Sequence, residues 1–387
     1  MGGRIADVRL TPVSASRAGI VCGHVIVQLT SDDGIEAVGE MSDFQHLPMY
    51  HVDVPELERT LRELLLGRDV RDANTLTRRL EEAFPSSDSL YDKAGVIRCG
   101  VDVALWDLRA KLLDVNLAEM MGGRVRDSLP IAYPIFRQQS VADVAANLAV
   151  VRRMLERGFH RFRVYVGRNA DLDREFLRSA REEFGDAIAI KSLDFSNLLD
   201  AREAARFIES TRDVAYEFVE APARAGDHDG LRFVRERTLV PVSEHATSPR
   251  AALQLASDGA VDVLNVGLFV LGGITPALRV LAIAQAAGLP VVIGTTQELS
   301  IGTSAGALVG VSTAADVLAS DPVGPLLYQR DVVATPLEFR DSALIAPTGP
   351  GLGMAVSPEL LKAATDPLRW GAADTTSVVD RAGSLTK

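Results

Sequence analysis

The sequence has very little cysteine, with only Cys22 and Cys99 among its 387 residues. The two residues lie far apart in the chain, and neither belongs to a CxxC motif. This spacing supports neither a disulfide framework nor a thiolate metal site. We therefore expect both cysteines to be small, buried hydrophobic residues.

Long hydrophobic runs are also missing, although hydrophobic residues make up 47% of the chain. No segment approaches the roughly 18 consecutive apolar residues that are needed to cross a bilayer. The N-terminal segment lacks the apolar stretch of a secretory signal, and the residues after Gly2 fit myristoylation poorly. We expect a globular, cytoplasmic protein that does not bind a membrane.

Positive charge is in deficit, because the formal net charge is −11 at pH 7 and the sequence pI is about 5.2. Such a chain repels phosphate backbones. No basic cluster interleaved with aromatic residues offsets this repulsion. We therefore do not expect nucleic acid as a partner.

Short apolar runs alternate with amphipathic stretches between residues 131 and 318. This alternation is typical of successive βα units around a parallel sheet. The helical stretches end at or near glycine, as helix C-termini often do. Seven runs are predicted to be strands, and an eighth could lie near 315–318. The seven are IAYPIF (131–136), FRVYV (162–166), AIAIKSLD (187–194), AYEFVE (215–220), LVPVS (239–243), VDVLNVG (261–267) and LPVVIG (289–294).

This rhythm favours a closed β/α barrel over an open doubly wound sheet. A dinucleotide fold has little support, because no GxGxxG motif follows the first strand and a Gly-Gly pair follows the sixth instead. Residues 1–128 predict a separate α+β unit in which antiparallel strands with an Asp-Gly turn precede helices. Residues 129–324 are assigned to the barrel. Residues 325–387 are richer in Pro and Gly, and we expect this segment to return to the first unit.

Acidic residues recur where the third, fourth and fifth apolar runs end. Asp194 ends the third run, Glu220 ends the fourth, and Glu244 and His245 end the fifth. The C-terminal ends of barrel strands converge on the active site, so these side chains should lie close together. Like charges crowded at one point need a cation, and oxygen-rich ligands with an open coordination position suit Mg²⁺. Taken singly, each acid could instead be a loop or N-cap residue.

Four features together resemble the mandelate racemase and muconate lactonizing branches of the enolase superfamily. They are GVDVALWDLRAK (100–111), the acids at the strand ends, LFVLGGIT (268–275) and GTTQELSIG (294–302). The resemblance covers nearly the whole chain. It implies a modified (β/α)7β barrel of the TIM type with an α+β capping domain built from both terminal parts. It also implies a metal at strands three to five, where Asp194 and Glu220 match directly and the third ligand stays open between Glu244 and His245.

The chain departs from the usual pattern of this superfamily where the catalytic bases are expected. The second-strand Lys-x-Lys is replaced by Arg163-Val164-Tyr165. Gly267 stands in place of a sixth-strand lysine, and Gly294 stands in place of a seventh-strand histidine. Two-base racemisation through those groups is therefore excluded.

The Arg-x-Tyr sequence, together with Tyr91 and His46 in the capping segment, resembles a galactarate dehydratase family. Period-two alternation places Arg163 and Tyr165 on the same face of their strand, either inside or outside the barrel. On the inside, the guanidinium would favour the phenolate of Tyr165 over the phenol, whose ordinary pKa is about 10. We therefore predict Tyr165 as the base and Arg163 as its activator. The resemblance implies Tyr91 as the acid that protonates the leaving hydroxyl.

The predicted activity is that of a Mg²⁺-dependent hydro-lyase. It would convert the small-molecule acid sugar galactarate into a 2-keto-3-deoxy diacid through a metal-stabilised enediolate. Two alternatives stay open. One is dehydration or epimerisation of a different acid sugar or carboxylate, and the other is a non-catalytic metal-binding barrel. The candidate substrate-binding residues are Arg17, His46, Ser196 and Thr296. We also expect the chain to form a homo-oligomer.

Overall fold

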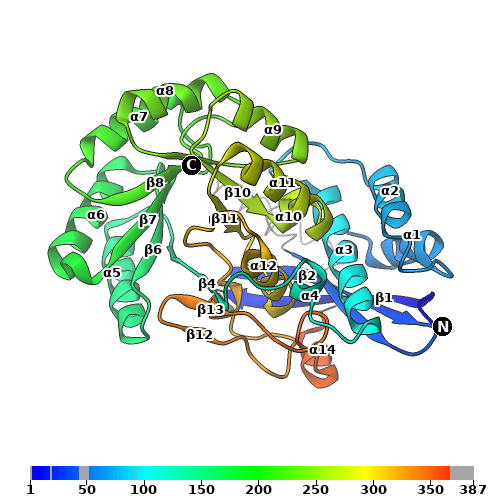
Figure 1. Cartoon of the computed structure of the whole chain (residues 1–387). Coiled ribbons are helices and arrows are strands. Elements are labelled where there is room, and N and C mark those ends of the chain that lie inside the picture. Colours follow the sequence, from blue (N-terminus) through cyan, green and yellow to red (C-terminus); the bar gives the residue numbers. More distant parts are fainter. Residues whose placement is uncertain (1, 18–19, 43–51, 91, 367–387) are drawn as a thin grey trace.

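The computed structural model describes residues 2–17, 20–42, 52–90 and 92–366. In this part of the chain, a three-stranded antiparallel sheet is followed by a curled seven-stranded parallel sheet and a second small antiparallel sheet. Figure 1 shows the long blue strands with α1, α2 and α3 on one side of the molecule, and the parallel strands with their helices on the other. The predicted α/β fold with a separate antiparallel unit is confirmed at this level.

The first sheet is an antiparallel meander in which β2 pairs with both β1 and β3. The tight turn between β2 and β3 closes through a hydrogen bond from the N–H of Gly34 to the carbonyl of Ser31. Gly34 has a φ of +82°, a conformation that glycine adopts without steric cost. Four helices follow the sheet. The bounds are β1 (Ile5–Arg17), β2 (Ile20–Ser31), β3 (Glu36–Met41), α1 (Val54–Leu65), α2 (Ala73–Ala83), α3 (Lys93–Leu112) and α4 (Leu117–Met120).

The parallel sheet contains the seven predicted strands in chain order, from β5 at one edge to β11 at the other. Helices connect successive strands and lie outside the curled sheet (Figure 1). No helix in the described part of the chain is both long and apolar enough to span a membrane. The strands are β5 (Tyr133–Ile135), β6 (Arg161–Tyr165), β7 (Ala189–Asp194), β8 (Tyr216–Glu220), β9 (Val242–His245), β10 (Val263–Gly267) and β11 (Val291–Gly294). The helices are α5 (Val141–Glu156), α6 (Ala170–Phe184), α7 (Ala201–Ser210), α8 (His228–Thr238), α9 (Pro249–Ser257), α10 (Leu268–Leu271), α11 (Ile274–Ala287) and α12 (Ser300–Ser312).

The segment 317–321 runs between the two edges of this parallel sheet. Val317 makes a parallel bridge with Val291 of β11, and Ser320 makes another with Ile131, just before β5. One segment therefore contacts both edges, although it is not itself a strand among the described elements. The curled parallel sheet is confirmed, and the closed (β/α)7β barrel stays a prediction.

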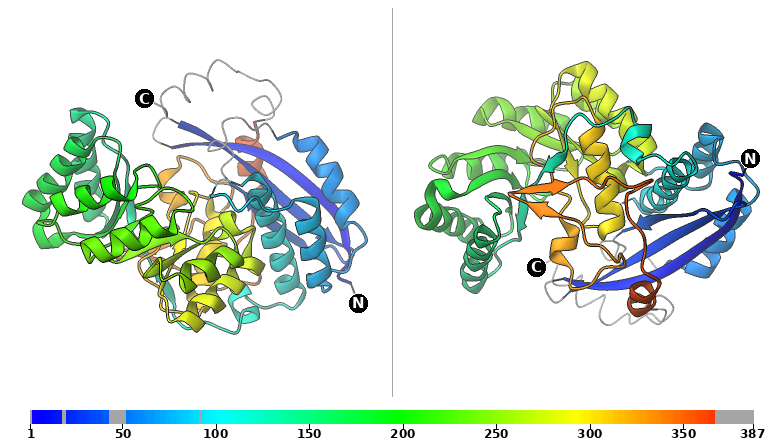
Figure 2. Two further views of the ribbon diagram at one scale, coloured as in Figure 1. Left: turned by 90° about the horizontal axis from the view of Figure 1, so that it is seen from above. Right: turned by 60° about the horizontal axis from the view of Figure 1, so that its bottom comes forward.

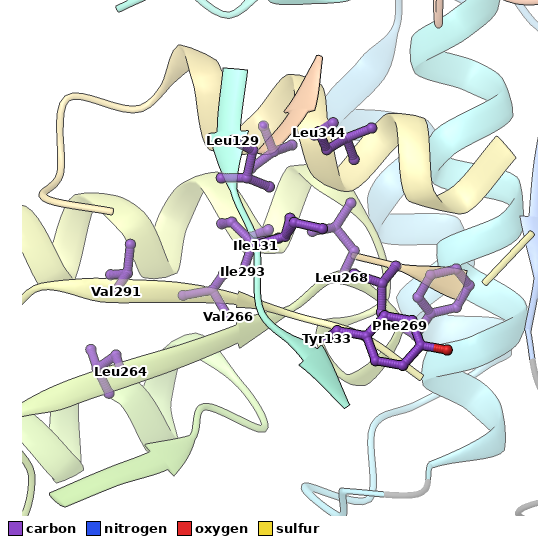
Figure 3. Packing of buried hydrophobic residues seen from close by; sticks show 14 of the residues in the cluster. Leu129, Ile131, Tyr133, Leu264, Val266, Leu268, Phe269, Val291, Ile293 and Leu344 are labelled. Carbon is purple, nitrogen blue, oxygen red and sulfur yellow. The ribbon is translucent and has the colours of Figure 1, made fainter. Parts of the chain in front are cut away.

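Side chains from both units join in one main hydrophobic core. This core includes Cys22 and Cys99, which are fully buried, as predicted. Figure 3 shows part of it, where Ile131 packs among side chains of β10 and β11 such as Val266 and Ile293. The shared core ties the antiparallel unit to the parallel sheet.

The chain after the parallel sheet returns to both earlier sheets. Strands β12 and β13 form the third sheet with β4, which precedes the parallel sheet. Helix α14 lies beside β1 (Figure 2), and Thr365 pairs with Val13 of that strand. The segment after the parallel sheet therefore contacts the N-terminal unit, and the division of the chain at residues 128 and 324 stays a prediction. The bounds are β4 (Ser128–Pro130), α13 (Gly324–Leu327), β12 (Phe339–Arg340), β13 (Ala343–Ile345) and α14 (Pro358–Ala364).

Two carboxylates of the N-terminal unit cap helices that follow strands of the parallel sheet. Asp102 of α3 accepts hydrogen bonds from the N–H (3.0 Å) and the hydroxyl (2.6 Å) of Thr275 in the first turn of α11. Glu40 of β3 accepts from the N–H groups of Leu299 (2.8 Å) and Gly302 (2.9 Å) at the start of α12. The N-cap residues of these helices provide no side-chain cap. The unpaired N–H groups and partial positive charge of both helix starts therefore bind the N-terminal unit.

We predict that Asp102→Ala lowers the free energy of unfolding by about 2–3 kcal/mol, because it removes a cap and leaves the Thr275 N–H without its acceptor. Urea unfolding followed by circular dichroism measures this change. Glu82→Ala is the control, since that side chain is 61% exposed on α2, and it should change the free energy by less than about 0.5 kcal/mol. An Asp102→Ala effect no larger than that of the control would contradict the capping account.

Candidate active site

The parallel register brings the residues at the strand ends to one level inside the curled sheet. Tyr165 of β6 pairs with Asp194 of β7, which pairs with Glu220 of β8. Residues directly opposite one another on neighbouring strands point to the same face, so these three side chains share a face. Arg163 lies two residues before Tyr165 and shares it too. The structure thus places all four predicted residues together.

Arg163 is 5% exposed, and its guanidinium lies among three carboxylates. Its Nε and Nη2 donate to Oδ2 of Asp194, Nη2 lies 3.4 Å from Oε1 of Glu220, and Nη1 lies 3.3 Å from Oδ2 of Asp321. Burial raises the pKa of Glu220. Burial acts on Asp194 in the same direction, but the guanidinium groups of Arg163 and Arg137 outweigh it and lower the pKa of that carboxyl. Arg163 therefore supplies the positive charge that these buried acids need.

The Tyr165 ring is surrounded by one aromatic ring and two guanidinium groups. Phe136 stacks on it with ring centroids 5.8 Å apart, and the guanidinium carbons of Arg163 and Arg137 lie 4.6 Å and 5.0 Å from its centroid. Burial raises the pKa of Tyr165, and the opposing charge of Arg163 does not reverse this direction. Arg163 is therefore beside Tyr165 as predicted, but the pKa of Tyr165 is raised and not lowered.

Lys191 is the one lysine on the described strands of the parallel sheet. Strand β7 carries a bulge at this residue, which changes its alternation. Lys191 is fully buried, donates to Oδ1 of Asp321 at 2.7 Å and lies 5.4 Å from the ring centroid of Phe218. Asp321 therefore contacts both Lys191 and Arg163. Asp321 was not among the residues predicted from the sequence. The available signal was its position just after residues 315–318, where an eighth strand could lie.

The two candidates at the end of β9 point to opposite faces. His245 pairs with Asn265 of β10, and Asn265 donates to Oε1 of Glu220 at 3.0 Å, so His245 faces the buried acids. Its Nε2 lies 3.3 Å from Oε1 of Glu220, and its Nδ1 lies 3.4 Å from Oε1 of Glu244. Burial opposes protonation, but the hydrogen bond to Glu244 and the charge of Glu220 raise the pKa of His245. Glu244 instead accepts a hydrogen bond from Asn197 at 2.9 Å.

Two predicted substrate-binding residues contact acids of this region. Ser196 donates its N–H and its hydroxyl to Oδ1 of Asp194, at 2.7 Å and 2.9 Å. Thr296 donates its N–H and its hydroxyl to Oε1 of Glu298, at 2.6 Å and 3.1 Å. Burial raises the pKa of Glu298 to about 7. In this structure both residues therefore orient carboxylates.

The remaining predicted residues belong to the N-terminal unit. Arg17 is buried at the end of β1, where its Nε lies 3.2 Å from Sγ of Cys22 and its guanidinium lies 5.9 Å from the ring centroid of Tyr328. His46 and Tyr91 lie outside the described residues. Their predicted roles as substrate contact and acid therefore stay predictions.

The donor set at the strand ends has the chemistry for a divalent cation. Oε2 of Glu220 is buried without a hydrogen-bond partner, as is Oδ2 of Asp321, and such atoms are costly unless something compensates them. Within the described residues, no three His, Cys, Asp or Glu side chains are arranged closely enough to hold a metal ion. The guanidinium of Arg163 lies between Asp194 and Glu220 instead.

Family models match the chain over most of its length. The model described as "Enolase C-terminal domain-like" matches residues 146–360. The model described as "Mandelate racemase / muconate lactonizing enzyme, N-terminal domain" matches residues 4–122. The two matches together cover both the antiparallel unit and the parallel sheet.

Individual relatives agree with these matches. The chain is 28% identical to a chloromuconate cycloisomerase of Pseudomonas putida over 92% of this chain and 97% of that protein. It is 24% identical to an N-succinyl-L-Arg/Lys racemase of Bacillus cereus over 88% of this chain and 90% of that protein. A solved structure of a muconate lactonizing enzyme has a TM-score of 0.83 at 26% identity and covers 94% of this chain and 100% of its own. The chain therefore belongs to the enolase superfamily and carries an N-terminal domain of the mandelate racemase and muconate lactonizing enzyme type.

Proposed function

We propose that this chain is an enzyme that removes the proton beside the carboxylate of a small-molecule substrate, with Tyr165 as the base. The observation that carries the proposal is the shared inner face of Arg163, Tyr165, Asp194 and Glu220. A phenol beside two guanidinium groups can lose its proton more easily than the same phenol without them. Membership in the enolase superfamily supports an enzymatic role.

Asp194, Glu220 and His245 are the residues that would hold Mg²⁺ in this proposal. We choose His245 over Glu244 because the pairing of β9 with β10 turns the His245 side chain toward Glu220. In addition, Glu244 lies beside Nδ1 of His245, which leaves Nε2 for the metal. A carboxylate behind a histidine ligand is a recurrent arrangement in metal sites, since it fixes the orientation of the ring. When bound, the ion would offset the negative charge that develops on the substrate carboxylate.

The residues of the chain divide the remaining work. As a phenolate, Tyr165 accepts the proton from the carbon beside the carboxylate, and the charge of Arg163 acts against the burial that raises its pKa. Asp321 orients the guanidinium of Arg163 through an ion pair, and Lys191 holds Asp321 in place through a second ion pair. Because Arg163 stays protonated at all relevant pH values, it is an electrostatic partner and not a base.

The narrowest substrate we propose is an acid sugar, with galactarate as the first candidate for dehydration to a 2-keto-3-deoxy diacid. Support comes from Arg163-Val164-Tyr165 at the position where the resemblance implies paired lysines. In this mechanism the β-hydroxyl leaves as water after protonation, and Tyr91 is the proposed donor. Dehydration or epimerisation of another acid sugar keeps the same first step.

A second candidate follows from the relatives, which include cycloisomerases and a racemase. These relatives favour a reaction that shares the proton transfer at the carbon beside the carboxylate but ends in cycloisomerisation or racemisation. The side chains weigh against an amine base, because Lys191 is buried in an ion pair with Asp321. A substrate panel therefore needs muconate and N-succinyl amino acids beside the acid sugars.

We predict that Tyr165→Phe lowers the rate of 2-keto-3-deoxy product formation from galactarate by at least about 100-fold, because it removes the base. Loss of solvent deuterium exchange at the substrate α-carbon, followed by NMR, should accompany this change. Tyr216→Phe is the matched control, since Tyr216 begins β8 at the end away from the site and its hydroxyl lies 3.3 Å from that of Thr211. Turnover that survives in a folded Tyr165→Phe protein would rule out the proposed base.

We predict that His245→Ala weakens Mg²⁺ binding by at least about 100-fold, because it removes a ligand. Glu244→Gln should weaken binding by only about 10-fold, because Glu244 contacts the ligand His245 and not the ion. Isothermal titration calorimetry on the metal-free protein measures both values. Glu36→Gln, an exposed change on β3, is the control and should leave the affinity unchanged. The reverse order of effects would assign the third ligand to Glu244.

A further inference from the structure

Arg137 lies directly after β5, two residues beyond Ile135, at the same end of the sheet as the candidate site. Its Nε donates to the carbonyl of Val166 at 3.1 Å, and its Nη2 donates to Oγ of Ser196 at 2.7 Å. Its guanidinium carbon lies 5.0 Å from the ring centroid of Tyr165. Three contacts at the ends of β6 and β7 therefore fix the orientation of this partly buried side chain.

Arg137 forms no ion pair with a carboxylate in the described part of the protein, although its charge helps to lower the pKa of Asp194. No described carboxylate lies within ion-pair distance of it, whereas Arg163 lies within 4 Å of Asp194, Glu220 and Asp321. The contacts of Arg137 use two of the five N–H donors of a guanidinium, and both acceptors are neutral. A fixed, partly buried cation with free donors is suited to an anionic ligand.

We propose that Arg137 forms a carboxylate subsite that selects substrates with a second carboxylate. The proposal rests on the proposed function, in which the reacting carboxylate lies at Asp194, Glu220 and His245. That arrangement leaves the remaining N–H donors of Arg137 for a different anionic group of the same ligand. Arginine matches a carboxylate through two parallel hydrogen bonds, which gives geometric selection as well as attraction.

The test compares Arg137→Gln with its parent in a Tyr165→Phe background, where ligands should bind without turnover. Calorimetry in saturating Mg²⁺ measures the affinity for galactarate and for galactonate, which has one carboxylate fewer on the same carbon chain. Arg137→Gln should weaken galactarate binding by about 10- to 100-fold and leave galactonate binding within about twofold. Arg137→Lys should recover part of the galactarate affinity. Arg161→Gln, which breaks an exposed ion pair to Glu217 at the other end of β6, should change neither.

Equal losses for both ligands, or no loss for galactarate, would overturn the subsite. The panel also includes glucarate and muconate, and a parent that binds none of the diacids would overturn it as well. Failure of the proposed function gives a different result from failure of the subsite. In that case a diacid would bind to the protein with intact Tyr165, but neither product nor deuterium exchange would be detected. In that case the Arg137→Gln comparison still decides the subsite.

Discussion

The buried charges at the strand ends are the constraint on which this site depends. Three carboxylates, those of Asp194, Glu220 and Asp321, share the space with two cations, Arg163 and Lys191. Isolated charges in such surroundings cost many kcal/mol, so each side chain is held in place by its partners. The three carboxylates outnumber these two cations, and Oε2 of Glu220 and Oδ2 of Asp321 are buried without a hydrogen-bond partner. This excess is the physical reason for expecting a further cation at the site.

The rest of the fold keeps these groups in position. Parallel register aligns Tyr165, Asp194 and Glu220 at one level. Capping of α11 by Asp102 and of α12 by Glu40 binds the N-terminal unit to the helices that follow β10 and β11. Because α12 starts directly after the loop at the end of β11, this contact fixes one wall next to the strand ends. Fold and site are therefore coupled through hydrogen bonds between the two units.

The sequence predicted the seven strands and the acids that end them, because apolar runs and their last residues are local features. It did not predict which residue of the Glu244-His245 pair faces inward, since that depends on pairing with Asn265 on another strand. Likewise, Lys191 is reoriented by a bulge that no local pattern reveals. The sequence also failed to predict that the pKa of Tyr165 is raised. The spacing of residues predicts a neighbouring charge, but it does not predict how deeply a side chain is buried.

The central claim is that an inward-facing phenol opposes a divalent ion across a bound acid. A crystal structure of the Tyr165→Phe protein with Mg²⁺ and galactarate tests it most directly. The account predicts an ion bound to Asp194, Glu220 and His245, with the substrate α-carbon facing the ring at position 165. An ion bound elsewhere, or a substrate whose α-carbon points away from that ring, would contradict it.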